Sequence, residues 1–153
     1  MLLPEIPKLL KDLSNPPKEL FYLAKEGFWT SQNDIFENCL AVVGSRRMTD
    51  YGRRVIDKLI PQLVFEKKTV VSGFMYGTDQ YAHQTCLDNG GKTVAVLGWG
   101  IDKKLAGYDK KLADLIIEKD GLLISEWETQ EGTNWTFPVR DRIIAALSKE
   151  VFI

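Results

Sequence analysis

Histidine and cysteine are scarce in this chain of 153 residues, which holds one histidine, His83, and two cysteines, Cys39 and Cys86. Three such side chains cannot build a disulfide framework, and by themselves they cannot supply the four ligands of a structural zinc site. The chain also lacks the ~18 consecutive apolar residues of a transmembrane helix and the basic and then apolar start of a signal peptide. We therefore expect a cytoplasmic protein without a bound metal ion and without a membrane association.

A strong net charge is absent too, since the formal net charge is -1 at pH 7. This near balance argues against an overall basic nucleic-acid-binding surface, although it leaves local patches open. Charge is uneven along the chain: residues 45–68 carry seven lysines or arginines against three acids, whereas residues 120–131 carry four acids and no base. One end of the molecule can therefore attract phosphate groups while another end repels them.

The composition is that of an ordinary globular protein, with 44% hydrophobic and 27% charged residues. These values exclude a disordered tail, a collagen-like fibre and a coiled-coil rod. At roughly 100–200 residues per domain, the length predicts one domain over residues 1–153. Within it we distinguish an N-terminal segment, residues 1–39, from a sheet core, residues 40–153.

Short apolar runs alternate with amphipathic segments in the sheet core. The runs are typical of strands buried on both faces, and they lie at residues 40–43, 69–71, 93–97 and 122–124. Helical periodicity occupies residues 51–65, 77–88 and 109–119. Pro61 lies inside the first of these segments and predicts a kink or a break in that helix. The alternation predicts βαβ units with right-handed crossovers, and hence a Rossmann-like, doubly wound, mainly parallel sheet in a three-layer α/β/α arrangement.

The two ends of the chain add shorter elements. Residues 6–13 have the apolar spacing of a short opening helix, and residues 20–23 are compatible with a strand. Residues 150–153 begin another apolar run, and the chain stops inside it. Either this run is an edge strand or the sequence is a fragment whose last strands are missing.

Each predicted strand of the core runs into a segment suited to ligand binding, and in an open parallel sheet these strand ends line one crevice. Glycines there let the backbone approach a ligand, helix N-termini offer N–H groups to an anion, and serine and arginine add hydrogen bonds to phosphate oxygens. One such glycine more often marks a tight turn, but four segments in series favour a phosphate site. The candidate residues at these ends are Gly44, Ser45, Arg46, Arg47, Ser72, Gly73, Gly77, Asp79, Gly98 and Gly100.

Several catalytic patterns are missing from these segments. The spacing matches neither G-x-G-x-x-G nor G-x-x-x-x-G-K-[ST], and no G-x-S-x-G elbow occurs, which argues against a dinucleotide site, a Walker NTPase and a serine hydrolase. His83 follows Asp79 by four residues and could form an acid–base pair with it, but we favour a structural histidine bonded near a helix start. Trp99, Trp127 and Trp135 could stack on bases, although core or rim packing is the default for each.

Residues 137–142 open another predicted helix, in which a single residue separates Arg140 from Arg142. Two arginines at this spacing cannot both face the core. A solvated helix start with an Asp–Arg pair and a phosphate-facing role remain equally open. For Arg142, a structural ion pair with Asp141 or Glu126 is a further alternative.

The order of these motifs extends over residues 2–153 without interruption: AVVGSR at 41–46, VSG at 71–73 followed by GTD at 77–79, GGKTVAVLGWGID at 90–102, SE at 125–126 and the helix at 137–148. This order resembles the DNA-processing protein A family, DprA, also called Smf. The resemblance implies a cytoplasmic bacterial protein that binds single-stranded DNA, is not an enzyme, needs no cofactor and helps to load the recombinase RecA in natural transformation. It also implies a homodimer, and it places the DNA pocket at Gly44, Ser45, Arg46, Ser72, Gly73, Gly77, Lys110, Arg140 and Arg142.

The chain departs from the family pattern at two positions. Asp109 and Asp141 stand where the family has asparagine, so negative charge lies near a site meant for phosphate, and either the DNA affinity is lower or the ligand differs. The family's RecA and dimer contacts lie largely beyond the segment matched here. The alternatives are a sensor of a nucleotide or phosphate ligand and a phosphoribohydrolase-like enzyme, although the P-G-G-x-G-T-x-x-E motif of such enzymes is absent.

Overall fold

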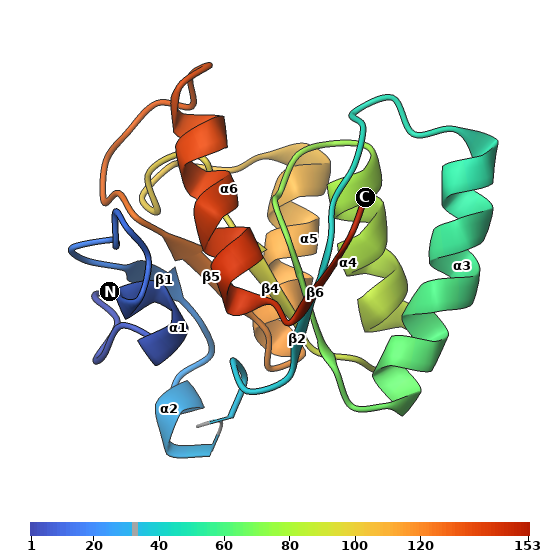
Figure 1. Ribbon diagram of the computed structural model, residues 1–153, viewed down its shortest axis with the longest axis horizontal. Helices are drawn as coiled ribbons and strands as arrows, with labels where there is room; N and C mark the ends of the chain where they lie inside the picture. Colours follow the sequence, from blue (N-terminus) through green and yellow to red (C-terminus); the bar gives the residue numbers. More distant parts are fainter. Residues whose placement is uncertain (32–33) are drawn as a thin grey trace.

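The computed structural model describes residues 1–31 and 34–153. Over these residues the strands form one six-stranded sheet in the order β1-β5-β4-β3-β2-β6, with helices on both faces (Figure 1). Strands β2 to β6 run parallel, and β1 pairs antiparallel with β5 at one edge. The strands are β1(Phe21–Leu23), β2(Cys39–Val42), β3(Thr69–Ser72), β4(Thr93–Val96), β5(Leu122–Ser125) and β6(Glu150–Phe152). The predicted Rossmann-like, mainly parallel α/β/α class is confirmed.

The four central strands are buried along their whole length because both faces of the sheet are covered. Successive side chains of a strand point to opposite faces. On β2, Ala41 accordingly packs under the N-terminal segment and α6(Thr136–Leu147), whereas Leu40 and Val42 pack against α3(Asp50–Phe65) and α4(Thr78–Asp88). The buried residues of α5(Gly107–Glu118) lie on the same face as α4. Figure 1 shows α6 and the N-terminal segment on the side of the sheet facing away from α3, α4 and α5.

Helix α3 runs through Pro61 without interruption, so, of the kink or break that the sequence predicted there, the break is wrong. A proline in a helix interior costs about 3 kcal/mol, because one hydrogen bond is lost and the ring crowds the preceding turn. Ile56, Ile60 and Leu63 are buried on the inner face of α3, and each such burial contributes roughly 1.5–3 kcal/mol. Tertiary packing therefore offsets the local penalty. At its start the Thr49 side chain accepts a hydrogen bond from the Gly52 N–H at 3.1 Å.

The two ends of the chain hold shorter elements than the core. The opening helix is a single turn, α1(Lys8–Lys11), and a second short helix, α2(Phe28–Ser31), was not predicted. Strand β6 occupies the edge of the sheet beside β2, with all three of its residues exposed. Among the residues that the structure describes, no helix combines the length and apolar character needed to cross a membrane.

Candidate phosphate-binding pocket

A cavity of about 330 Å³ lies at the carboxyl end of β2, between the loop after β3 and the first turns of α6. Of the predicted site residues, four line it, and they come from three separate segments of the chain, as expected for the crevice at the ends of parallel strands. The four are Gly44, Arg46, Asp79 and Arg140. The remaining lining residues are Val43, Met75, Phe137, Asp141, Ile144, Ala145 and Val151.

The start of α6 is fixed by a reciprocal pair of hydrogen bonds. The Thr133 N–H donates to the Thr136 hydroxyl at 2.8 Å, and the Thr136 N–H donates to the Thr133 hydroxyl at 3.4 Å. This arrangement works like a capping box, because each threonine satisfies a backbone donor that the helix itself leaves free. Pro138 then occupies the first turn, where a missing N–H costs nothing. This fixed helix start holds Phe137, Arg140 and Asp141 at the cavity.

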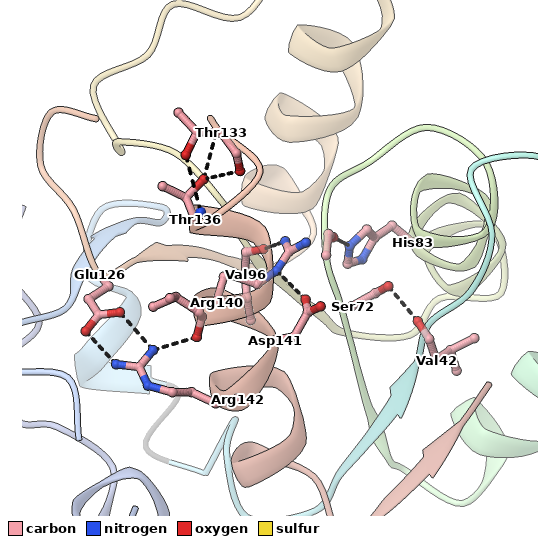
Figure 2. A network of polar contacts seen from close by, with 12 residues as sticks. Val42, Ser72, His83, Val96, Glu126, Thr133, Thr136, Arg140, Asp141 and Arg142 are labelled. Atoms are coloured by element: carbon pink, nitrogen blue, oxygen red, sulfur yellow. Dashed lines mark hydrogen bonds and ion pairs between the residues drawn. The ribbon is translucent and has the colours of Figure 1, made fainter. Parts of the chain in front are cut away.

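Arg140 is the innermost cation of the cavity, with only 4% of its surface exposed. Its guanidinium donates to the Val96 carbonyl and, through Nε, to Asp141 Oδ1 at 2.9 Å (Figure 2). Gly73, which has no side chain, leaves space for the Arg140 guanidinium. A Cβ at position 73 would lie 2.3 Å from Asp79 Oδ2 and 2.8 Å from Arg140 Nη1. Gly73 therefore serves the site by letting two buried charged groups lie against the backbone.

Asp79 lies in the first turn of α4 and is buried beside Arg140. Burial raises the pKa of this carboxyl above its ordinary value, and the positive charge of Arg140 opposes that rise. The carboxylate and the guanidinium compensate each other inside the cavity wall. Arg140 is thus already partnered on the protein side before any anion enters.

Arg46 is the exposed cation of the cavity. Its guanidinium carbon lies 5.1 Å from the centre of the Phe137 ring and 5.9 Å from that of Tyr76. The Arg140 guanidinium carbon lies 5.9 Å from the same Phe137 ring, so two cations flank one aromatic side chain. In the described part of the chain, no carboxylate lies within ion-pair distance of Arg46. Arg46 is therefore available to an anionic ligand.

The loop after β2 is tied to the start of α4. The Ser45 carbonyl accepts hydrogen bonds from the Thr78 N–H at 3.2 Å and the Thr78 hydroxyl at 3.0 Å. Gly77 has φ +89°, and a Cβ there would lie 2.6 Å from the same carbonyl. The first N–H group of α4 is thus used by the chain itself. Ser45 Oγ accepts from the Arg47 N–H at 2.9 Å, and neither Ser45 nor Arg47 lines the cavity.

Arg142 does not join Arg46 and Arg140, so its expected convergence with them on one phosphate site is wrong, and the alternative of an ion pair with Glu126 is confirmed. Its guanidinium forms a two-pronged ion pair with Glu126, at 2.6 and 2.8 Å, and also donates to the carbonyls of Asn15 and Val139. At 3.6 residues per turn, positions 140 and 142 lie about 200° apart around α6. Figure 2 shows the two guanidiniums on different sides of the helix. Arg142 therefore fastens α6 to the end of β5 and to the N-terminal segment.

Lys110 lies on α5 and does not line the cavity. Its Nζ pairs with Asp114 at 2.6 Å on the exposed face of the helix. Gly98 and Gly100 do not line the cavity either, and they allow neighbouring groups to pack closely. A Cβ at Gly98 would lie 2.4 Å from the Phe137 ring, and one at Gly100 would lie 2.5 Å from the Gln130 backbone nitrogen. Ser72 is fully buried, and its hydroxyl donates to the Val42 carbonyl at 2.5 Å (Figure 2).

His83 is also fully buried and belongs to the frame of the site. Its Nε2 donates to the Gly73 carbonyl at 2.5 Å, and its Nδ1 lies 2.6 Å from the Thr93 hydroxyl oxygen. Burial lowers the pKa of His83 to about 4, so the ring is neutral at pH 7. These bonds agree with the structural role favoured from the sequence, in which the histidine holds the backbone near a helix start.

The sequence reasoning missed Phe137 and Gln80. Phe137 stands between the first cavity and a second one of about 230 Å³, and it contacts Trp99 edge to face with ring centres 6.3 Å apart. Gln80 joins the starts of two helices through a hydrogen bond from its Nε2 to Asp109 Oδ1 at 2.8 Å. Neither role leaves a local sequence signal, because both depend on contacts between distant segments. Within the described residues, no cluster of three or more His, Cys, Asp or Glu suited to a metal ion is present.

The doubly wound sheet places this chain among Rossmann-like proteins, and its cationic pocket lies at the strand ends where such sheets bind ligands. Residues 2–153 match the DNA recombination-mediator protein A family, and the chain belongs to that family. It is 37% identical to Protein Smf of Synechocystis sp. over 151 residues, which are 98% of this chain and 37% of that protein. It is 40% identical to DNA processing protein DprA of Streptococcus pneumoniae over 115 residues, or 74% of this chain and 40% of the relative.

Two solved structures share the fold. DNA processing protein A from Helicobacter pylori, studied for its single-stranded DNA binding mode, superposes with a TM-score of 0.83 at 26% identity, over 99% of this chain and 66% of that one. The X-ray structure of DprA from Streptococcus pneumoniae gives a TM-score of 0.80 at 35% identity, over 95% of this chain and 49% of that one. The chain thus spans about two-fifths of the length of the two curated relatives. The family resemblance read from the motifs is confirmed.

Proposed function

We propose that this chain binds single-stranded DNA, with one backbone phosphate held at Arg46 in the cavity beside Arg140. The observation that carries the proposal is the exposed Arg46 guanidinium, free of carboxylate partners in the described part of the chain, at the rim of a cavity whose inner cation is already fixed. The DNA-binding relative from Helicobacter pylori supports the choice of ligand.

The charged side chains of the cavity determine how many phosphate groups it can hold. Arg46 can form a charge-assisted hydrogen bond to a phosphate oxygen, which contributes roughly 1.5–3 kcal/mol. Asp141 lines the same cavity with an exposed carboxylate, and Asp79 lies deeper in it. These two acids oppose a second phosphate in the cavity. We therefore expect one phosphate at this point, with the strand extending over the neighbouring surface.

Binding assays with labelled strands test the proposal. Fluorescence anisotropy would compare a labelled 20-mer of thymidine with a 20-base-pair duplex, and the single strand should bind more tightly because its backbone can bend into the cavity. A preference for the duplex would contradict the proposal. The phosphate contact is independent of base identity, so other single strands should bind at this cavity as well.

The wider role follows the family. We propose that the chain acts as a DNA-binding protein and not as an enzyme, that it works in the cytoplasm, and that the whole protein hands single strands to RecA and forms a homodimer. The support for these proposals is family membership. Because the chain covers 37% of the length of Protein Smf, the proposals on RecA and on the homodimer refer to the whole protein.

A second candidate is a small phosphate ligand such as a nucleoside monophosphate. The size of the cavity favours it, since about 330 Å³ falls within the roughly 300–1,000 Å³ of small-molecule pockets. Titration with nucleoside monophosphates discriminates between this ligand and single-stranded DNA. Micromolar binding of a mononucleotide without measurable binding of the oligonucleotide would favour the small phosphate ligand.

A further inference from the structure

A second cavity adjoins the proposed phosphate site and has a different chemical character. The two cavities share Met75 and Phe137 as walls. At about 230 Å³ the second cavity is smaller than the roughly 300–1,000 Å³ of pockets for drug-sized ligands, and it suits one planar ring system. Its lining is Phe74, Met75, Tyr76, Gln80, Trp99, Lys103, Leu105, Asp109, Gly132 and Phe137.

Several aromatic side chains form the walls of this cavity. Trp99 contacts Phe74 and Phe137 edge to face, with ring centres 6.4 and 6.3 Å apart. Lys103 lies across Trp99, with Nζ 5.0 Å from the ring centre. Aromatic surfaces of this kind accept the faces of nucleobases, and a lysine beside them attracts the attached backbone.

The polar groups of the cavity come from the starts of two helices. Gln80 in α4 is buried, and its Nε2 donates to Asp109 Oδ1 at 2.8 Å and to the Phe74 carbonyl at 3.3 Å. Asp109 in α5 is half-buried. The Gln80 amide thus fixes one carboxylate oxygen of Asp109 and leaves Oδ2 as an acceptor. A ligand that enters here meets an oriented hydrogen-bond acceptor with negative charge.

We propose that this second cavity binds one nucleobase of the strand whose phosphate lies at Arg46, and that Asp109 selects a base carrying an exocyclic amino group. The inference rests on the proposed single-stranded DNA binding. Cytosine presents its N4 amino group to a carboxylate, as aspartate and glutamate commonly accept from that group in DNA recognition. Thymine presents the O4 carbonyl at the same place, and its lone pairs repel the carboxylate. Asp109 is therefore a specificity-determining residue.

Two homopolymers of matched size test this selection. Labelled 20-mers of deoxycytidine and of thymidine, both flexible pyrimidine strands, are titrated by fluorescence anisotropy against the wild-type protein, Asp109→Asn and Glu118→Gln. Glu118 lies in the exposed last turn of α5, so its variant removes one negative charge from the same helix away from the cavity. We expect the wild type and Glu118→Gln to bind the cytidine strand at least about 10-fold more tightly than the thymidine strand, as for one hydrogen bond to a charged group.

Asp109→Asn should bring the two affinities together, because an amide can donate to the O4 of thymine as well as accept from cytosine. Equal affinities in the wild type would overturn the base selection while single-stranded DNA binding stands. A cytidine preference that persists in Asp109→Asn would overturn the role of Asp109. If neither strand binds, both the proposed function and this inference are wrong.

Discussion

Replacing Arg142 with alanine should destabilise the fold without touching the phosphate site. The Arg142 guanidinium makes two bonds to Glu126, at 2.6 and 2.8 Å, and further bonds to the carbonyls of Asn15 and Val139. The two charged side chains retain 19% and 18% exposure. Breaking a fully buried ion pair by removing one partner costs about 3–5 kcal/mol. Because water reaches this pair in part, we expect a loss of about 2–4 kcal/mol.

The assay is urea unfolding followed by tryptophan fluorescence, together with the melting temperature. For a chain of this size 1 kcal/mol corresponds to roughly 2–4 °C, so the Tm of Arg142→Ala should fall by about 4–16 °C. Lys110→Ala is the matched control, since its pair with Asp114 is 60% exposed on each side, and such i,i+4 pairs contribute about 0.3–0.5 kcal/mol. A Tm for Arg142→Ala within 1–2 °C of that control would refute the structural role of the pair.

Two further predictions concern the frame of the site. Gly73→Ala places a Cβ 2.3 Å from Asp79 Oδ2 and 2.8 Å from Arg140 Nη1. Overpacking of this kind should lower the free energy of unfolding by about 1–3 kcal/mol. A urea midpoint equal to that of the wild type would show that the two charged side chains move aside without cost. Burial lowers the folded-state pKa of His83 from 6.5 to about 4. The neutral ring therefore makes its full contribution to the free energy of unfolding above pH 6.5. This contribution declines as the pH falls toward 4, by up to about 3 kcal/mol. His83→Asn should remove this part of the pH dependence, and urea midpoints between pH 4 and 7.5 that change equally in both proteins would contradict the assignment.

The central strands could be predicted from the sequence because a strand that is buried on both faces has a continuous run of apolar residues. Residues 40–43 and 93–97 read as continuous apolar runs, and they became β2 and β4 with bounds shifted by one residue. The crevice followed from the same reasoning, since the carboxyl ends of parallel strands share one edge of the sheet. Arg46 and Arg140 were brought to that edge as expected.

The contacts that decide each side chain's role could not be read in the same way. The sequence left Arg142 with two possible acidic partners, Asp141 and Glu126, and only the packed structure selects Glu126. Its bond to the Asn15 carbonyl, 127 residues away, has no sequence signal. The bond between Gln80 and Asp109 likewise depends on how two helices are placed side by side. Local patterns fix the strands and helices, whereas these pairings depend on the packed tertiary structure.

The salt dependence of single-strand binding tests the phosphate contact at Arg46 most directly. The affinity of a labelled 20-mer of thymidine is measured at several salt concentrations for the wild type, Arg46→Ala and Arg54→Ala, the last being an exposed arginine of α3 that lines neither cavity. Each phosphate neutralised on a single strand contributes about 0.7 to the slope of log affinity against log salt. Arg46→Ala should bind about tenfold more weakly with a slope lower by about 0.7, and Arg54→Ala should resemble the wild type. An unchanged affinity and slope in a folded Arg46→Ala protein would contradict the account.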